Sequence, residues 1–331
     1  MDLITHAALG AAAAASIAPA QRLRQAAFTG ALAAMLPDAD ILITSSEDPL
    51  LNLEFHRHFT HSLVFVPVGA ALAAALVWLL LRRRIEFGPL YLWALIGYLL
   101  APLLDACTSY GTHLLWPFSA GPIAWNLIAV IDPLFSLLVI VPLVVALVKF
   151  RPGLARIAVS LAALGLAYGG IQHERAERHA HELAAARGHV PERLLVKPTL
   201  GNMILWRSLY VREGTIHADA IRLGFLGGAR AYAGESAQLV DPERDLGLPA
   251  NSRTRRDVAR FALFTDALVV RHPSRPELIG DARYAMLPTS IEPIWGIAID
   301  ASAPEAPVRF ETMRRLTPEL RGRFIDMLLG R

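Results

Sequence analysis

Histidine and aspartate side chains recur at the borders of the apolar runs of this sequence, where an ionisable group is costly and therefore informative. Imidazole nitrogen and carboxylate oxygen together suit zinc and similar divalent ions, whereas a single cysteine, Cys107, cannot make a thiolate site. The groups occur in these short segments: Thr5-His6, Pro37-Asp38-Ala39-Asp40, His56 to Ser62, Asp105 to His113, and Asp132-Pro133. Together they predict a His/Asp metal site.

The local spacings are compatible with such a site. Asp38 and Asp40 are two residues apart, so in an extended turn their side chains can face the same way. His56 and His61 are five residues apart, which fits if His61 lies in a first helical turn and His56 on the approaching loop. More than three such ligands would fit a two- or three-metal cluster that clamps a phosphoryl group. Arg57 is placed to hold a phosphate oxygen.

The apolar runs that must position these groups are long enough to cross a bilayer, whose core of about 30 Å needs roughly 20 apolar residues. The long runs are residues 62–81, 87–104, 121–148 and 152–172. Shorter Ala-rich runs at 3–19 and 25–36 predict a helical hairpin packed into the bundle. The expected fold is an all-α transmembrane helical bundle with about five membrane segments.

Basic residues predict the orientation of this bundle. They cluster between the apolar runs, as Arg22 and Arg24, then Arg82, Arg83 and Arg84, then Lys149, Arg151 and Arg156. Alternate threading puts all the clusters on one face, which should be cytoplasmic. The His/Asp groups then converge on the outer ends of their helices. The run at 7–20 follows Met1-Asp2 rather than a basic segment, which favours a retained helix over a cleaved signal peptide.

The composition changes after about residue 173. Of the 331 residues, 54% are hydrophobic and 18% charged, and the apolar excess lies in the first half. We expect a transmembrane domain at 1–172, a polar helical stalk at 173–197 and a soluble α+β domain at 198–331 on the non-cytoplasmic side. Its expected elements are short strands near 203–211, 215–223, 265–271, 281–287 and 293–299 and a helix at 311–330. A net charge of +3 gives no reason to expect a nucleic-acid partner.

Taken in order, the motifs resemble the YdjM/YbcI-type family of membrane-bound metal-dependent hydrolases. The resemblance covers roughly the first 150 residues, and the family is distantly similar to the zinc-dependent phospholipase C and P1-nuclease group. It implies a helical metal site that hydrolyses an ester or phosphoester. The matching residues are Met1 to His6 with Gly10, Leu36 to Asp40, His56-Arg57, Thr60 to Ser62, Asp105, Thr108, Tyr110-Gly111 and Trp116-Pro117.

The resemblance also implies roles for single residues. The implied ligands of roughly one to three divalent ions, zinc foremost, are His6, Asp38, His56, His61 and Asp105, followed by Asp40. We expect Asp40 or Asp132 to be the general base and Arg57 to steady the reacting group. His58 and His113 depart from the family pattern, and either could add a ligand.

These inferences predict a hydrolase of the bacterial plasma (inner) membrane, with its metal site on the non-cytoplasmic side and an amphiphilic, lipid-like substrate drawn from the membrane lipids. Two alternatives stay open: a proton- or ion-coupled transporter, and a non-catalytic metal-binding scaffold. No motif indicates a protein partner for the C-terminal domain. No His-Glu-x-x-His, Gly-x-Ser-x-Gly or Walker-type phosphate loop occurs. Histidines 173, 179, 181 and 189 are typical of a solvated helix face.

Overall fold

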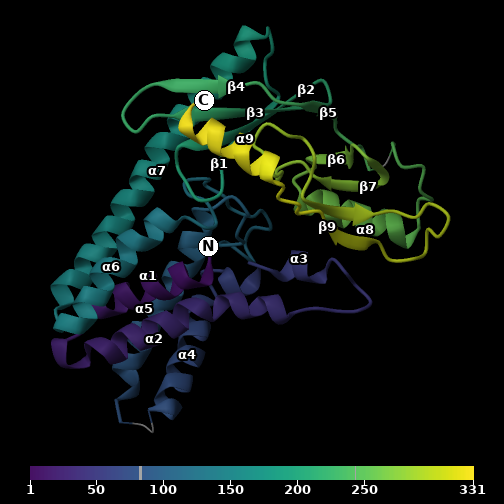
Figure 1. The fold of residues 1–331 in the computed structure, drawn as a ribbon. Coiled ribbons are helices and arrows are strands. Elements are labelled where there is room, and N and C mark those ends of the chain that lie inside the picture. The colour runs from purple at the N-terminus through teal and green to yellow at the C-terminus, as the bar shows by residue number, and fades with distance from the viewer. Residues whose placement is uncertain (82–83, 243) are drawn as a thin grey trace. The chain divides into compact units, whose positions relative to one another are not determined.

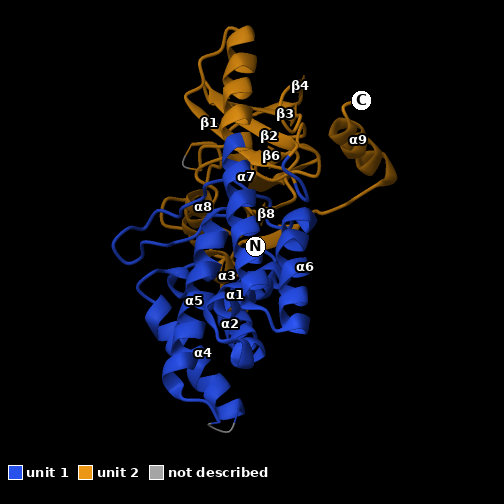
Figure 2. Cartoon of the chain, turned by 90° about the vertical axis from the view of Figure 1, so that its left-hand side faces the viewer, with its two compact units in different colours: residues 1–42, 55–171, 200–203 blue, residues 43–54, 172–199, 204–331 orange. Residues whose placement is uncertain are grey.

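The computed structural model describes residues 1–81, 84–242 and 244–331. They form two compact units, which Figure 2 colours separately. Unit 1 comprises residues 1–42, 55–171 and 200–203, and unit 2 comprises residues 43–54, 172–199 and 204–331. The long helix α7 (Pro152–Ala186) passes from one unit into the other.

Unit 1 is helical (Figure 1). Its helix α1 packs against α2, α5 and α6, and α4 packs against α5. A further helix, α3 (Leu51–Phe55), ends where the chain returns to unit 1. The other elements are α1 (Leu3–Ile17), η1 (Ala20–Arg22), α2 (Leu23–Met35), η2 (Pro37–Leu42), η3 (Phe59–His61), α4 (Val66–Leu80), α5 (Phe87–Ala106), α6 (Pro133–Lys149) and the first part of α7.

Glycines let α1, α2 and α5 approach one another closely. A Cβ atom on Gly30 would lie 2.2 Å from the carbonyl oxygen of Gly10, and one on Gly97 would lie 2.4 Å from the carbonyl oxygen of Gly30. Such a crossing has room only for residues without a side chain, as in many membrane helix pairs. The three helices are therefore held in a fixed relation, and with them the beginning of α1 and the ends of α2 and α5.

A helical membrane region is confirmed, but the prediction of about five membrane segments is not supported. By length and composition, the described residues contain two helices that could cross a membrane, α5 and α7. A third crossing results if Leu51–His61 and Val66–Leu80, bent by 86°, form one broken span.

The other predicted spans are too short. Helices α1 and α6 have 15 and 17 residues, which at 1.5 Å per residue gives roughly 22–26 Å. The apolar run at 121–148 is helical only from Pro133, because Asp132 caps α6 there. Arg82 and Arg83, which belong to one of the predicted basic clusters, lie outside the described residues.

In the described residues, unit 2 contains two antiparallel sheets and two helices of its own, besides most of α3 and the last part of α7, so a C-terminal domain with strands is confirmed. The first sheet has the order β1-β2-β3-β4, with β5 also paired to β3, and the second has the order β6-β7-β8-β9. The strands of the first are β1 (Arg193–Pro198), β2 (Leu205–Arg212), β3 (Thr215–Leu223), β4 (Ala229–Tyr232) and β5 (Ser236–Gln238). The second has β6 (Val269–His272), β7 (Arg275–Asp281), β8 (Trp295–Ala298) and β9 (Arg309–Thr312), and the helices are α8 (Arg253–Phe264) and α9 (Pro318–Leu329).

Helix α7 and strand β7 end at positions that the sequence pattern did not predict. Helix α7 ends at Ala186 because Gly188 takes a φ of 70° and closes the helix, so the second half of the predicted stalk includes strand β1. The strand expected at 281–287 is wrong: β7 ends at Asp281. The carboxylate of Asp281 accepts hydrogen bonds from the backbone and guanidinium of Arg283, which turns the chain out of the sheet.

Candidate metal centre

His6, Asp38 and Asp105 come together where α1 begins and where α2 and α5 end. One ligand atom from each lies within 4.8 Å of the others. His6 Nε2 is 3.2 Å from Asp105 Oδ1 and 4.0 Å from Asp38 Oδ2. His6 and Asp105 are buried, whereas the Asp38 side chain is 19% exposed. The structure thus gathers three predicted ligands that are far apart in the sequence.

His61 joins this cluster from η3. Its Nε2 atom is 3.5 Å from Asp38 Oδ1 and 3.2 Å from Asp105 Oδ2. Nevertheless, His61 Nε2, Asp105 Oδ2 and His6 Nδ1 have no hydrogen-bond partner among the described residues. Buried polar atoms seldom lack a partner. Nitrogen and carboxylate oxygen atoms that face one another in this way fit a divalent cation.

Asp40 lies behind the histidines rather than among the ligand atoms. Its Oδ1 is 2.8 Å from His56 Nδ1 and its Oδ2 is 3.2 Å from His61 Nδ1. Oδ2 also accepts hydrogen bonds from the Arg57 backbone N–H (2.8 Å) and the Thr60 hydroxyl (2.9 Å). A carboxylate on Nδ1 fixes the tautomer of an imidazole and leaves the Nε2 lone pair for a ligand bond. These contacts favour a positioning role for Asp40.

The same contacts determine the charge of Asp40. Burial alone would raise the pKa of this carboxyl, but the hydrogen bonds with His56 and His61 hold its pKa well below the usual range. Asp40 is therefore a carboxylate throughout the physiological pH range.

Arg57 is almost fully buried beside the cluster, with 3% of its surface exposed. Its guanidinium lies 2.8 Å from Asp105 Oδ1, donates to the Thr108 hydroxyl oxygen (2.9 Å) and stacks 5.1 Å from the Tyr110 ring. The Met1 amino group also contacts Asp105 Oδ1. Arg57 adopts a φ of 60°, which costs a residue with a side chain free energy and is typical of functional sites.

Tyr98 was missed by the sequence analysis. Its hydroxyl donates a 2.8 Å hydrogen bond to the carbonyl oxygen of Thr60, and the residue is 1% exposed. The contact ties α5 to η3, which carries His61. The signal was a tyrosine inside an apolar run, because a buried phenol needs a partner. The sequence could not say which.

Asp132, which the sequence analysis gave with Asp40 as a candidate general base, caps α6. Its Oδ1 accepts a 3.0 Å hydrogen bond from the Phe135 backbone N–H. Burial raises the pKa of Asp132 against the effect of that bond. In the described part of the chain, Asp132 makes no contact with His6, Asp38 or Asp105.

His58 and His113 pack against each other, with ring centroids 4.7 Å apart. The ring of His58 is also 5.5 Å from that of Trp116, and the His113 backbone N–H donates to the carbonyl oxygen of Arg57. Burial and the nearby His58 lower the pKa of His113. The two histidines thus form an aromatic pair next to the Arg57 backbone.

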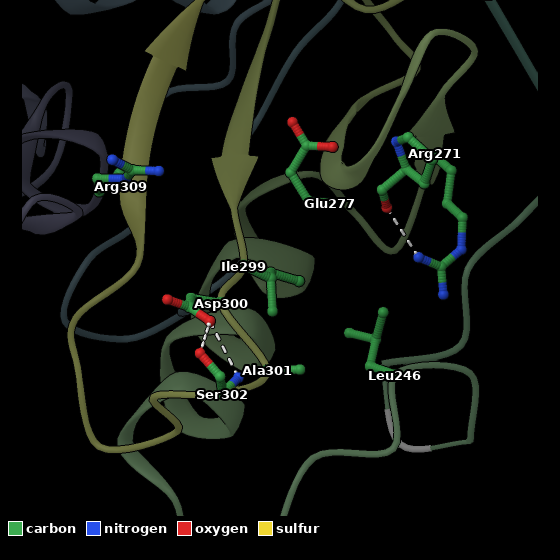
Figure 3. Close-up of a pocket in the computed structure, with 9 residues that line it drawn as sticks. Leu246, Arg271, Glu277, Ile299, Asp300, Ala301, Ser302 and Arg309 are labelled. Atoms are coloured by element: carbon green, nitrogen blue, oxygen red, sulfur yellow. Dashed lines mark hydrogen bonds between the residues drawn. The ribbon is translucent and has the colours of Figure 1, made fainter.

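Unit 2 has a separate hollow of about 590 Å³, shown in Figure 3. Two arginines and two carboxylates line it, so their charges balance. Arg271 donates to the carbonyl oxygens of Pro276 and Asp245, and Asp300 accepts from Ser302. None of the predicted site residues lines this hollow.

The part of the chain that carries the His/Asp cluster is similar to known proteins. Residues 1–176 match the YdjM inner membrane protein family. The chain is 35% identical over 125 residues to inner membrane protein YbcI of Escherichia coli K12, which covers 35% of this chain and 68% of YbcI. It is 25% identical over 165 residues to the uncharacterized protein YfhP of Bacillus subtilis 168, or 50% of this chain and 49% of YfhP. The chain thus spans about half the length of YfhP, and no solved structure matches it.

Proposed function

Because this chain belongs to the YdjM inner membrane protein family, we propose that it is a membrane-bound hydrolase that depends on divalent metal ions. The observation that carries the proposal is the convergence of His6 Nε2, His61 Nε2 and the Asp38 and Asp105 carboxylates, in which the buried His61 Nε2 and Asp105 Oδ2 atoms have no hydrogen-bond partner among the described residues. A divalent cation among these atoms would take the imidazole nitrogens and carboxylate oxygens as ligands at once.

The ligands in this proposal are His6, Asp38, His61 and Asp105. Three of them hold their ligand atoms within 4.8 Å, and His61 Nε2 lies within 3.5 Å of the two carboxylates. A divalent ion held there, zinc foremost, would polarise the oxygen of an ester or phosphoryl group. Arg57 borders the ligands and supplies guanidinium donors for an anionic group of the substrate, and Thr108, which accepts from Arg57, helps to hold the guanidinium in place.

His56 is the proton acceptor in this proposal. Its Nδ1 lies 2.8 Å from Asp40, and its side chain is 22% exposed. The Asp40 carboxylate accepts from Nδ1–H and orients the ring, so Nε2 can take a proton from an attacking water. Asp40 therefore acts through His56, and Asp132 has no part in the reaction.

The substrate class follows from the surroundings of the cluster. The cluster lies at the ends of α1 and α5, and α5 is apolar enough to cross a membrane. Asp38, its most exposed ligand, is accessible at that end. We propose an ester or phosphoester of an amphiphilic lipid, whose head group reaches the site from the bilayer surface.

We also propose that the cluster lies on the non-cytoplasmic side. Basic residues gather at the other ends of the unit 1 helices: Arg24 donates to the carbonyl oxygen of Leu147, and Arg156 to that of Ser16. Cytoplasmic ends of membrane helices are rich in arginine and lysine. Alkaline phosphatase fused after Arg331 tests on which side of the membrane the C-terminus lies. We expect an active fusion, and an inactive one would contradict the proposed orientation.

Metal analysis of the detergent-purified chain is the primary test. We expect stoichiometric zinc or manganese in the wild type and its loss in a His6→Ala/His61→Ala variant. A His179→Ala/His181→Ala variant, changed on the outer part of α7, is the matched control and should keep the metal. Hydrolysis of phosphoester and phospholipid substrates should follow the metal content.

Two results would contradict the proposed function. A metal-free wild type after reconstitution with zinc and manganese would leave the cluster a structural or proton-relay role. Full metal occupancy without hydrolysis of any ester would favour a non-catalytic scaffold.

A further inference from the structure

The β3–β4 hairpin ends in an exposed apolar tip. Residues 224–228 join the two strands, and a 3.1 Å hydrogen bond from the Gly224 N–H to the carbonyl oxygen of Gly228 closes the loop. Phe225 is 61% exposed and Leu226 is 98% exposed. Adjacent large apolar side chains that a fold leaves uncovered mark a contact surface rather than a core.

A hydrogen bond from Arg175 of α7 holds the base of this tip at one level along that helix. The guanidinium of Arg175 donates a 2.9 Å hydrogen bond to the carbonyl oxygen of Gly224. Residues 157–173 of α7 carry no charged side chain, and α7 is long and apolar enough to cross a membrane. Arg175 follows two residues later, on the order of 3 Å further along the axis. The headgroup zone beyond the hydrocarbon core is roughly 5–8 Å deep, so an α7 whose uncharged segment fills the core would bring Arg175, and the loop bonded to it, to the depth of this zone.

The charge around the tip suits lipid phosphates. Residues 220–234 contain Arg222 and Arg230 but no carboxylate, and these arginines are register partners on β3 and β4. Arg222 donates to the carbonyl oxygen of Leu328 and Arg230 to that of Gly330, so both guanidinium groups are held near the strand ends. Arginine side chains next to an anionic bilayer are attracted to the lipid phosphates and add to the binding of the segment that carries them.

We propose that the β3–β4 tip inserts Phe225 and Leu226 into the interface of the bilayer that α7 crosses, with Arg222 and Arg230 against lipid phosphates. An apolar tip between arginines is the chemistry of a membrane-surface anchor. Unit 2 is thereby attached to the membrane at a second point besides α7.

The test places an environment-sensitive fluorophore at position 226 of the full-length chain. The variant Leu226→Cys is labelled with a nitrobenzoxadiazole dye and reconstituted in vesicles of phosphatidylethanolamine and phosphatidylglycerol. Val190→Cys and Leu263→Cys are matched controls, because both positions are 83% exposed and apolar. Cys107 is buried, and labelling of the unchanged chain gives the blank.

We expect headgroup-labelled nitroxide lipids to quench the dye at 226 at least several-fold more strongly than the dye at 190 or 263. Quenching at 226 should rise with the phosphatidylglycerol fraction and fall in an Arg222→Gln/Arg230→Gln background. Equal quenching at the three positions would overturn the proposal. A dye at 226 that is shielded from water but not quenched by these lipids would also overturn it, in favour of a protein partner or a second copy of the chain.

Discussion

At the scale of single residues, the acidic side chains of the cluster have different environments. Asp105 is fully buried, and its Oδ2 atom faces His61 without a hydrogen bond. Asp40 is also buried, but both its oxygens bind imidazole, backbone or hydroxyl groups. In the proposed function this difference separates Asp105, a ligand, from Asp40, a positioning residue, and the two roles predict different losses of metal affinity.

Asp40→Asn should weaken metal binding without abolishing it. The amide cannot hold both imidazole rings by charge, and loss of such a partner costs about 10–100-fold in metal affinity. Asp105→Asn, which changes a ligand, should cost more. Competition with a chromogenic chelator measures both. Asp132→Asn is the control: asparagine also caps helices, so affinity should be unchanged. Wild-type affinity in Asp40→Asn would remove its positioning role.

Lys197 gives a prediction about stability. Its amine is 6% exposed, lies 3.2 Å from the Tyr284 ring centroid and has no hydrogen-bond partner among the described residues. Burial lowers the pKa of Lys197 well below its usual value, and Arg207 and Arg283 add to this effect. At pH values between the lowered pKa and the usual one, the unfolded chain therefore binds a proton that the folded chain releases, which destabilises the fold.

The free energy of unfolding should accordingly rise with pH up to the unfolded pKa of Lys197, about 10.4. For this group alone the slope is at most about 1.4 kcal/mol per pH unit. Lys197→Met removes the charge and keeps the volume, so it should stabilise the chain more at pH 7 than at pH 9. Thermal unfolding midpoints in one detergent measure this. A gain that does not shrink at pH 9 would contradict a neutral amine in the folded state.

At the scale of elements, the glycine crossing of α1, α2 and α5 holds the metal cluster together. Gly97→Ala places a Cβ atom 2.4 Å from the carbonyl oxygen of Gly30 and must push α2 and α5 apart. We expect a loss of about 1–3 kcal/mol in stability and a reduced metal content. Gly88→Ala is the matched control on α5, since a Cβ there meets no atom within 4 Å. Equal unfolding midpoints would show that the crossing is loose.

The sequence predicted which groups gather better than it predicted what each one does. The order of His6, Asp38, His61 and Asp105 at the ends of apolar runs was sufficient to predict a common layer, because burying such groups separately is costly. The capping role of Asp132 depends on one turn of backbone geometry, and so does the placement of Asp40 behind the histidines. Hydropathy does not contain that information.

The predicted bounds of the membrane spans and strands differ from the structure for a related reason. Apolar length predicts how much chain could be helical, but caps and turns decide how much is. Asp132 starts α6 late, and the contact between Asp281 and Arg283 ends β7 early. Side-chain bonds to the backbone of this kind compete with regular structure at every polar residue, and the pattern of apolar residues does not reveal which will form.

At the scale of the whole molecule, the chain inserts residues 43–54, here called the strap, into unit 2. Arg260 on α8 anchors the strap through paired hydrogen bonds to Asp48 and Glu54. The guanidinium lowers the pKa of Asp48, as expected for a carboxylate held by an arginine. The strap is therefore an integral part of unit 2.

Arg260→Ala should release the strap. Endoproteinase Glu-C, which cuts after glutamate, should then cleave at Glu47 and Glu54 faster. We expect the cleavage rate to rise on the order of tenfold, because the variant loses the partly exposed ion pairs that keep the strap closed. Arg256→Ala, on the same helix, is the control, because the Arg256 guanidinium donates to the carbonyl oxygen of Asn251, which lies outside the strap. Unchanged cleavage would mean that other contacts hold the strap.

The position of the strap in the chain has a mechanical consequence. Two residues separate Asp40 from the beginning of the strap, and one residue separates its end from His56. Residues 41–55 therefore form a loop that the Asp40–His56 hydrogen bond closes. Force applied to the strap through Arg260 therefore pulls on both ends of one hydrogen bond. The spacing of this carboxylate and imidazole therefore depends on the chain segment that Arg260 holds in unit 2.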